Sequence, residues 1–224
     1  MGSRLRPVAL WGAALAAVGA VAAAAVVWTR VRSRCQGRPS EPRGSLPAPA
    51  NAGQRRHVLV LGLDGAGKSS VLRCLAAGRG RRGAAPTEGF NVVCIHAGQA
   101  PMEFVEIGGS ESLRSYWRMY LPQVLLLVYV VDSADHARLP VAKQLLHQLI
   151  QNDSTLPVVV LANKQDLEGA FSITDIHDAL ALSDIGDRRK MFLIGTHVAE
   201  DGSEISSSMK DAKELITQLV LEMQ

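Results

Sequence analysis

Short apolar runs alternate with amphipathic stretches from residue 57 to the end of the chain. The apolar runs have the length of buried strands and cover residues 57–61, 92–96, 103–107, 124–131, 157–162 and 191–195. Helical periodicity is found after residues 62–69 up to about residue 77, and over residues 112–120, 135–151, 172–182 and 208–223. This order predicts an α/β fold, with a mostly parallel six-stranded sheet covered by helices on both faces. Ligands of such folds bind at the carboxyl ends of the strands.

The first part of the chain has a different pattern. Residues 8–28 carry no charge, and as a helix they would span about 31 Å, enough to cross the core of a bilayer. Ten of these 21 residues are alanine, which inserts less readily than leucine. Arginines flank the run and are more numerous after it, which predicts that the following chain faces the cytosol. We therefore expect an N-terminal hydrophobic helix that anchors the protein in a membrane.

Composition divides the chain into three segments. Residues 1–34 are expected to form the membrane anchor or targeting segment, residues 35–56 a flexible linker rich in Pro, Gly and Arg, and residues 57–224 a globular domain. A mitochondrial presequence is the main alternative for the N-terminus, because the first acidic residue is Glu41. A cleaved signal peptide is less favoured, since it would export the domain. The mitochondrial outer membrane and the endomembranes both fit the anchor.

The first 56 residues and the rest of the chain also differ in net charge. Residues 1–56 hold nine arginines and one acidic residue, a net charge of +8, whereas the remaining residues hold 15 basic and 20 acidic side chains, a net charge of −5. A basic N-terminal segment favours contact with anionic membrane lipid. Few aromatic residues accompany the arginines, so nucleic acid is not an expected partner. The globular domain is expected to be a monomer.

A phosphate-binding pattern follows the first predicted strand. Residues 62–69 match G-x-x-x-x-G-K-[ST], whose glycines let backbone N–H groups turn toward phosphate oxygens. The lysine adds positive charge, the serine hydroxyl is a ligand for Mg²⁺, and the helix N-terminus adds its dipole. A chance glycine-rich turn is the alternative, but the strand before the loop and the helix after it disfavour that interpretation. The expected nucleotide contacts here are Gly62, Leu63, Asp64, Gly65, Ala66, Gly67, Lys68, Ser69 and Ser70.

A second polar loop follows the strand predicted at residues 157–162. Its sequence is Asn163-Lys164-Gln165-Asp166. A carboxylate in the plane of the base accepts hydrogen bonds from both N1–H and the 2-amino group of guanine, and adenine presents neither arrangement. We expect Asp166 to supply this carboxylate, Asn163 to brace the loop, and the stem of Lys164 to cover the base. Taken alone, such a loop is more often a plain turn, but its place at a later strand end, about 100 residues after the phosphate-binding loop, favours the functional interpretation.

Two further segments carry groups suited to a triphosphate with Mg²⁺. Glu106 ends a predicted strand and is expected to hold the ion through water, and Gly109 offers its N–H to a γ-phosphate at close approach. Thr87 lies in the loop after the first helix, and its hydroxyl is expected to complete the metal shell. With Ser69, these residues form the predicted metal site.

These motifs resemble those of the Arf-like (ADP-ribosylation-factor-like) small GTPases. The resemblance covers about residues 57–224 and is carried by residues 62–69, 86–92, 107–109, 115–120, 130–135 and 163–166. It implies a P-loop GTPase fold that binds GTP and GDP with Mg²⁺. It further implies that Thr87 and residues 108–120 are switch regions reordered by the γ-phosphate, and that Phe90, Trp117 and Tyr120 face effector proteins. Ordinary core packing is an equal alternative for these aromatic residues.

The chain departs from the family pattern at four positions. Glu106 stands where the family carries Asp, Ser110 where it carries a water-orienting Gln, and Val105 where it usually carries Trp. The loop that would complete the base site falls at Thr196 and matches poorly. We therefore predict a membrane-tethered GTP-binding switch with weak intrinsic hydrolysis, in which no catalytic residue can be named with certainty. A nucleotide-binding pseudo-GTPase scaffold is the alternative, and the Asn163 loop argues against a P-loop ATPase.

Overall fold

The computed structural model describes residues 57–77, 79–81, 87, 89–97, 100–185, 189–199 and 201–223. The predicted anchor and linker, residues 1–56, lie outside these ranges. Within the described ranges, no helix combines the length and apolar character needed to cross a membrane.

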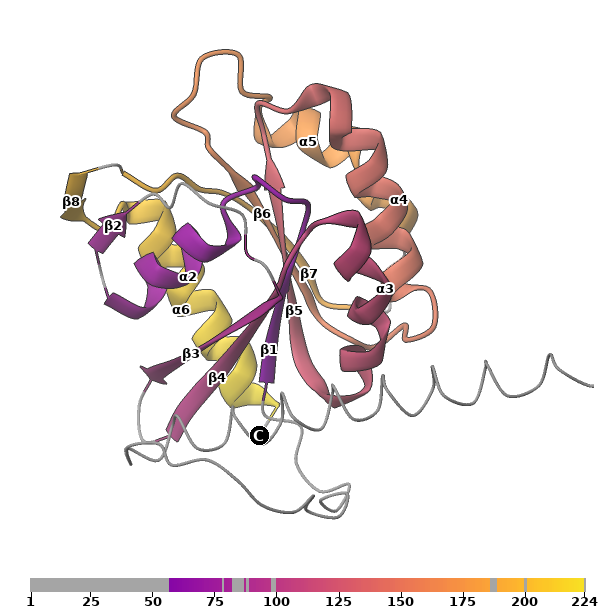
Figure 1. The fold of residues 1–224 in the computed structure, drawn as a ribbon, viewed down its shortest axis with the longest axis horizontal. Helices are drawn as coiled ribbons and strands as arrows, with labels where there is room; N and C mark the ends of the chain where they lie inside the picture. Colours follow the sequence, from indigo (N-terminus) through magenta and orange to yellow (C-terminus); the bar gives the residue numbers. More distant parts are fainter. Residues whose placement is uncertain are drawn as a thin grey trace, which may run out of the picture. The chain divides into compact units, whose positions relative to one another are not determined.

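A six-stranded sheet forms the centre of the domain (Figure 1). Its strands stand in the order β3-β4-β1-β5-β6-β7, and only the β3–β4 pair is antiparallel. The predicted mostly parallel six-stranded sheet is therefore confirmed. The strand bounds are β1 His57–Leu61, β3 Phe90–Ala97, β4 Ala100–Ile107, β5 Val124–Asp132, β6 Val158–Asn163 and β7 Met191–Gly195.

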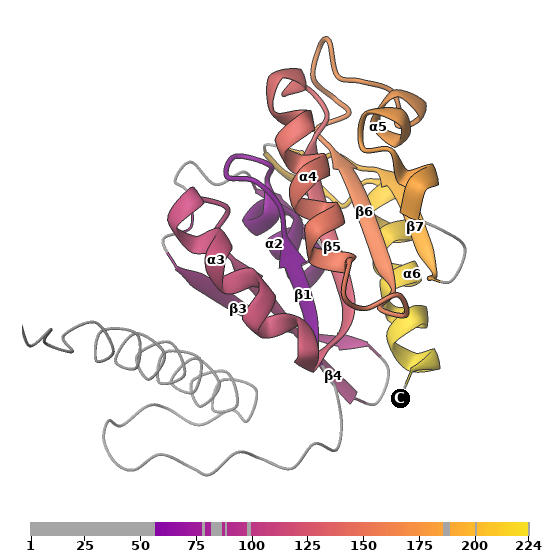
Figure 2. The same ribbon diagram turned by 90° about the vertical axis from the view of Figure 1, so that its right-hand side faces the viewer.

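Helices cover both faces of the sheet, as Figures 1 and 2 show from two directions. One face packs against α2 (Lys68–Ala77) and α6 (Ser207–Glu222), and the other against α3 (Glu111–Tyr120), α4 (Leu139–Ile150) and α5 (Ile173–Ala179). Side chains alternate along β1, so that Val58 and Val60 enter the first core while Leu59 and Leu61 enter the second. Burial on both faces explains why the strands read as continuous apolar runs.

Several element boundaries differ from those predicted. The helix expected over residues 135–151 begins as the 3₁₀ turn η2, His136–Arg138, and becomes α4 only where Pro140 can occupy its first turn. The helix expected over residues 172–182 ends at Ala179, because Ala181 takes a left-handed conformation with φ 46° before the turn η3, Leu182–Ile185.

Three short elements had no prediction. A further 3₁₀ turn, η1 (Leu121–Gln123), leads from α3 into β5. The strands β2 (Arg79–Arg81) and β8 (Asp201–Glu204) pair antiparallel in a separate two-stranded sheet.

The parallel topology brings distant loops to one edge of the sheet. Strands β1, β4, β5 and β6 all end there, so that the segments after Leu61, Ile107, Asp132 and Asn163 meet. The antiparallel β3 begins at the same edge, because Phe90 pairs with Ile107. The motifs found in the sequence therefore lie together at the carboxyl edge, as expected for this class of fold.

Candidate functional site

The loop after β1 requires glycine at two close approaches. Gly62 has φ 143°, and a Cβ there would lie 2.1 Å from the carbonyl oxygen of Val130 on β5. Gly67 has φ 92°, and a Cβ there would lie 2.4 Å from Nδ2 of Asn163 on β6. Any other residue would push the loop away from the strand ends, so the glycines fix the loop against the sheet.

The side chain of Lys68, the first residue of α2, folds back onto this loop. Its ammonium group donates hydrogen bonds to the carbonyl oxygens of Gly62 and Leu63, both at 2.9 Å, and the side chain is 5% exposed. Burial lowers the pKa of Lys68 to about 8, although the charges of Glu106 and Asp64 oppose this shift. The group is therefore a buried cation that an anion in the loop would stabilise.

Three oxygen atoms predicted to hold a metal ion come together. Ser69 Oγ lies 2.8 Å from Thr87 Oγ1 and donates to Glu106 Oε1 at 2.5 Å, and Thr87 Oγ1 donates to the same oxygen at 3.1 Å. Glu106 is fully buried, and its second oxygen accepts from Asn91 Nδ2 at 3.4 Å. The Ser69–Glu106 contact is direct, and the role predicted for Glu106, to hold the ion through water, stays a prediction.

These three oxygens are the donor type that Mg²⁺ prefers. The described residues contain no group of three or more His, Cys, Asp or Glu side chains that could hold a metal.

Asp64 in the loop contacts two arginines from other elements. Arg114 Nη2, on α3, lies 3.5 Å from Asp64 Oδ1, and Arg138 Nη1, in η2, lies 3.1 Å from Asp64 Oδ2. Arg114 also donates from Nε to the carbonyl oxygen of Gly109 at 2.9 Å, and Arg138 pairs with Asp135 at 2.5 Å. The sequence did not reveal these contacts, because no local motif links an aspartate to arginines so distant in the chain.

The segment after β4 is packed closely onto the same loop. A Cβ on Gly109 would lie 2.2 Å from the backbone nitrogen of Asp64, which explains the need for glycine. Gly108 donates its N–H to Gly89 O at 2.8 Å and accepts from the indole Nε1 of Trp117 at 3.1 Å. This side of the site is therefore joined to β3 and to α3.

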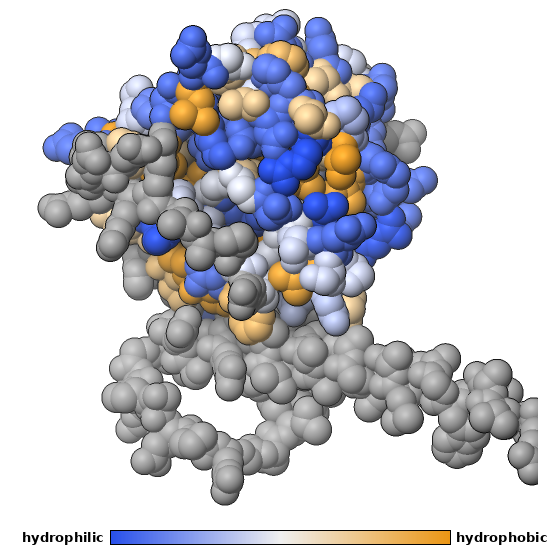
Figure 3. All heavy atoms as spheres, turned by 45° about the horizontal axis from the view of Figure 1, so that its top comes forward, coloured by the Kyte–Doolittle hydropathy of each residue, from blue (hydrophilic) through white to orange (hydrophobic). Residues whose placement is uncertain are grey.

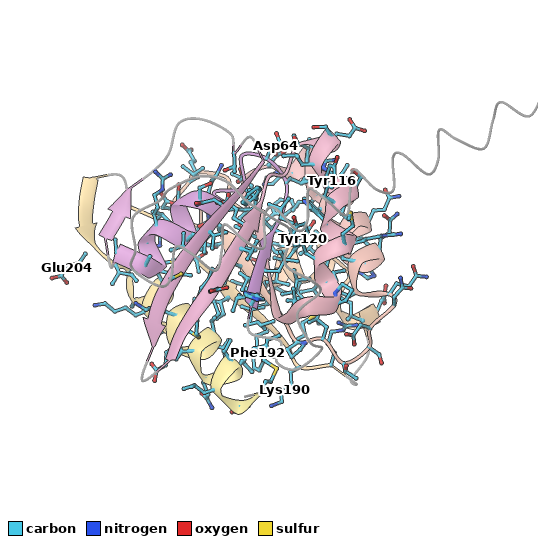
Figure 4. The ribbon with its side chains drawn as sticks, turned by 60° about the horizontal axis from the view of Figure 1, so that its bottom comes forward. Asp64, Tyr116, Tyr120, Lys190, Phe192 and Glu204 are labelled. Atoms are coloured by element: carbon cyan, nitrogen blue, oxygen red, sulfur yellow. The ribbon has the colours of Figure 1, made fainter. Side chains whose placement is uncertain are left out.

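The predicted effector surface needs correction at Trp117. This side chain is 1% exposed and belongs to the core beneath α3, because its indole is bound to the Gly108 carbonyl. Tyr120 is half-buried against the same core, and burial raises its pKa. The larger exposed apolar side chains of β3 and α3 are Phe90 at 38%, Tyr116 at 40% and Met119 at 38%. Figure 4 labels Tyr116 and Tyr120 on α3, with Asp64 in the loop after β1.

Ser110 occupies the position just before α3. It has extended backbone angles (φ −62°, ψ 151°) typical of a residue that caps a helix, yet its side chain makes no capping hydrogen bond. Its Oγ lies 3.3 Å from Ser112 Oγ. A hydroxymethyl group at this place is short, so it has less reach than the Gln of the family pattern.

Asn163 and Thr196 form a buried polar pair between β6 and β7. Asn163 Nδ2 donates to Ala66 O in the glycine-rich loop at 2.9 Å, and its Oδ1 accepts from Thr196 Oγ1 at 3.3 Å. Thr196 is fully buried, and its backbone exchanges bonds with Ala162 O and Gln165 N at 2.9 and 3.1 Å. The poorly matched Thr196 is therefore integrated into this loop.

The second loop is completed by Lys164, Gln165 and Asp166. Lys164 has φ 66°, and its ammonium bonds Asp132 Oδ2 at 2.5 Å. Gln165 Nε2 donates to Ser133 Oγ at 2.8 Å, and Asp166 is exposed. Asp132 and Ser133 are contributors that were noticed in the sequence only as part of the family resemblance. The edge that carries these loops is mainly hydrophilic, with hydrophobic areas between the polar ones (Figure 3).

Comparison with known proteins agrees with this arrangement. Residues 48–216 match the model of the ADP-ribosylation factor family. The chain is 60% identical over 171 residues to the human ADP-ribosylation factor-like protein 9, covering 76% of this chain and 91% of that one. It is 45% identical over 150 residues to the mouse ADP-ribosylation factor-like protein 10, covering 67% of this chain and 62% of that one.

A solved structure has the same fold. It is the small GTPase Arl6 (BBS3) of Trypanosoma brucei with the bound nucleotide analogue GppNp, which matches with a TM-score of 0.65 and 20% identity over 75% of this chain and 98% of that one. The family match spans most of the described domain and the human relative exceeds half identity, so this chain belongs to the ADP-ribosylation factor family, as an Arf-like small GTPase.

Proposed function

We propose that this protein binds GTP and GDP with Mg²⁺ and works as a molecular switch. The contact between Asn163 Nδ2 and Ala66 O carries the proposal, because it joins the loop suited to phosphates to the loop suited to guanine. One nucleotide could then occupy both loops. The family membership supports the same ligand.

The phosphates and the base of the nucleotide would contact different kinds of groups. Backbone N–H groups of the loop after β1 and the buried charge of Lys68 would bind the phosphates. Ser69 and Thr87 would hold Mg²⁺, which neutralises phosphate charge when it is bound. Asp166 would accept two hydrogen bonds from guanine, while Asn163 keeps the loop in place and the Lys164 stem covers the base.

Exchanging the base-reading carboxylate for an amide tests this proposal. In the full-length protein, Asp166→Asn should weaken GTP and improve XTP, changing the GTP-to-XTP preference by about 10³-fold or more, since a donor replaces an acceptor. Nucleotide competition at equilibrium measures this ratio. Glu168→Gln, a similar change two residues away, should leave it unchanged, and Lys68→Ala should weaken GTP and XTP alike. An unaltered ratio in Asp166→Asn would refute the assignment of guanine to this loop.

We further propose that intrinsic hydrolysis is slow. An attacking water needs an orienting group, and Ser110 is too short to replace the Gln of the family pattern. The rate should then fall below that of an ordinary small GTPase, which is on the order of 10⁻⁴ per second. The protein would remain GTP-loaded until a partner supplies the missing groups, for example an arginine that raises the rate by about 10³–10⁵-fold.

Effector proteins would bind the surface formed by Phe90, Tyr116 and Met119. These side chains are exposed on β3 and α3, the two elements joined to the phosphate side through Gly89, Gly108 and Gly109. A change in the phosphates could therefore alter this surface. Double replacement of Tyr116 and Met119 by Ser should abolish GTP-dependent partner capture without lowering GTP affinity, and capture retained by that variant would refute the surface.

The N-terminal segment would anchor the switch in a membrane, with the GTPase domain in the cytosol. The uncharged run at residues 8–28 and its arginine flanks support this part of the proposal. Carbonate extraction of cell membranes should leave the full-length protein in the pellet. Release into the supernatant, or a mature form that begins beyond about residue 30, would favour a peripheral or cleaved protein.

A further inference from the structure

The buried carboxylate of Glu106 directly contacts two hydroxyl groups of the site. Its Oε1 accepts hydrogen bonds directly from Ser69 Oγ at 2.5 Å and from Thr87 Oγ1 at 3.1 Å. Both hydroxyls are themselves candidate metal ligands, and they lie 2.8 Å apart. The three oxygens thus form a compact triangle with sides of 2.5, 2.8 and 3.1 Å.

This triangle has nearly the size of one face of a Mg²⁺ coordination shell. Mg²⁺ binds six oxygens in octahedral geometry at about 2.0–2.1 Å, so neighbouring ligands are about 2.8–3.0 Å apart. The three observed separations bracket that spacing. A single ion could therefore contact all three oxygens after shifts of a few tenths of an ångström.

The surroundings hold the carboxylate in this position. Glu106 is fully buried on β4, and its other oxygen accepts from Asn91 Nδ2 at 3.4 Å, on the paired strand β3. A buried carboxylate is costly unless it is paired or bound to a metal. Only Oε1 is directed at the hydroxyls, so that oxygen is the one available to an ion.

We propose that Glu106 is a direct ligand of the Mg²⁺ ion and takes the place of one metal-bound water. The proposal rests on the proposed function, because the ion would arrive with a guanine nucleotide. A shorter aspartate at this position would withdraw the carboxylate by one methylene and leave room for a bridging water. Ser69, Thr87 and Glu106 with two phosphate oxygens of a triphosphate leave one of six positions to water, whereas the aspartate variant leaves two.

Counting metal-bound waters tests this directly. The full-length protein and Glu106→Asp would be loaded with a non-hydrolysable GTP analogue and Mn²⁺, and the EPR signal would be recorded in ¹⁷O-enriched water. We expect one bound water in the wild type and two in Glu106→Asp. Glu103→Asp makes the same change on the same strand, where the carboxylate pairs with His57 at 2.9 Å, and it should keep the wild-type count. If Glu106→Asp proves unstable, the wild-type count alone decides.

The outcomes separate this inference from the proposed function. Bound nucleotide and Mn²⁺ with two waters in the wild type would overturn direct ligation by Glu106 and leave the switch proposal standing. Bound nucleotide without Mn²⁺ would overturn direct ligation together with the metal part of the switch proposal, and would leave guanine-nucleotide binding standing. Failure of the wild-type protein to retain any guanine nucleotide would overturn both.

Discussion

The two sides of the site are stabilised in different ways. On the base side, Asn163, Gln165 and Thr196 bond one another and the backbone of neighbouring parallel strands, and the buried groups are neutral. On the phosphate side, Lys68 and Glu106 are buried ions brought together from segments far apart in the chain. A neutral network is complete without a ligand, whereas the buried Lys68 ammonium keeps a desolvation cost that a bound anion would offset.

The pH dependence of stability should distinguish the two sides most strongly. The pKa of Lys68 is about 8 when folded and near 10.5 when unfolded, so between these values the unfolded state binds more protons. The free energy of unfolding of the nucleotide-free protein should therefore rise with pH across this window, by as much as about 3 kcal/mol, and be level above it. Denaturant unfolding at pH 7–11 of the wild type and of Lys68→Met measures the difference.

Two controls accompany that measurement. Lys68→Met should lack this rise, and GDP with Mg²⁺ should suppress it in the wild type, because phosphate charge keeps the ammonium protonated. A wild-type curve parallel to that of Lys68→Met over the whole range would show that burial does not perturb this lysine.

Breaking the neutral network should cost less but should not depend on pH. Asn163→Ala leaves the Ala66 carbonyl and the Thr196 hydroxyl without their partner, so we expect a loss of about 2 kcal/mol in the free energy of unfolding. Thr196→Val removes only the longer bond and should cost about 1 kcal/mol. Urea denaturation checks both values. Asn152→Ala, at an exposed turn, is the matched control and should stay within about 0.5 kcal/mol of the wild type.

A kinetic effect is expected on the phosphate side. Ser110→Gln should raise the intrinsic rate of GTP hydrolysis about tenfold, because a longer amide can orient the attacking water. Single-turnover hydrolysis of γ-labelled GTP measures this rate in the full-length protein. Ser112→Gln makes the same change two residues later on α3 and should have no effect. A wild type as fast as Ser110→Gln would mean that another group positions the water.

The sheet could be predicted from the sequence because buried parallel strands are continuous apolar runs. The ends of the helices could not be predicted in the same way, because the amphipathic pattern continues past them. Pro140 and the left-handed Ala181 set these ends through local backbone geometry. The small β2–β8 sheet was missed because Arg79–Arg81 and Asp201–Glu204 carry no hydrophobic signal.

The candidate site was predictable where one short motif supplies the residues, as in the loop after β1. The site was less predictable where the sequence allows two roles for a side chain and only its three-dimensional surroundings select one. Trp117 lies on an amphipathic helix, and its burial and its bond to the Gly108 carbonyl show that the indole points inward. The direct reach of Glu106 to Ser69 likewise depends on the register of β4 beside β1, in which Val60 pairs with Glu106.

The carboxylate of Asp64 is shared by two arginines from different elements, which would contact different ligands. It contacts Arg114 on α3 and Arg138 before α4, and Asp64 belongs to the loop that would surround phosphates. A protein that draws Arg114 toward itself and an anion that attracts the same guanidinium would compete with Asp64 for one group. Such couplings are reciprocal. The anion would change the affinity for the protein by the same factor as the protein changes the affinity for the anion. Communication between the two would then need no large movement, only the exchange of one arginine's partner.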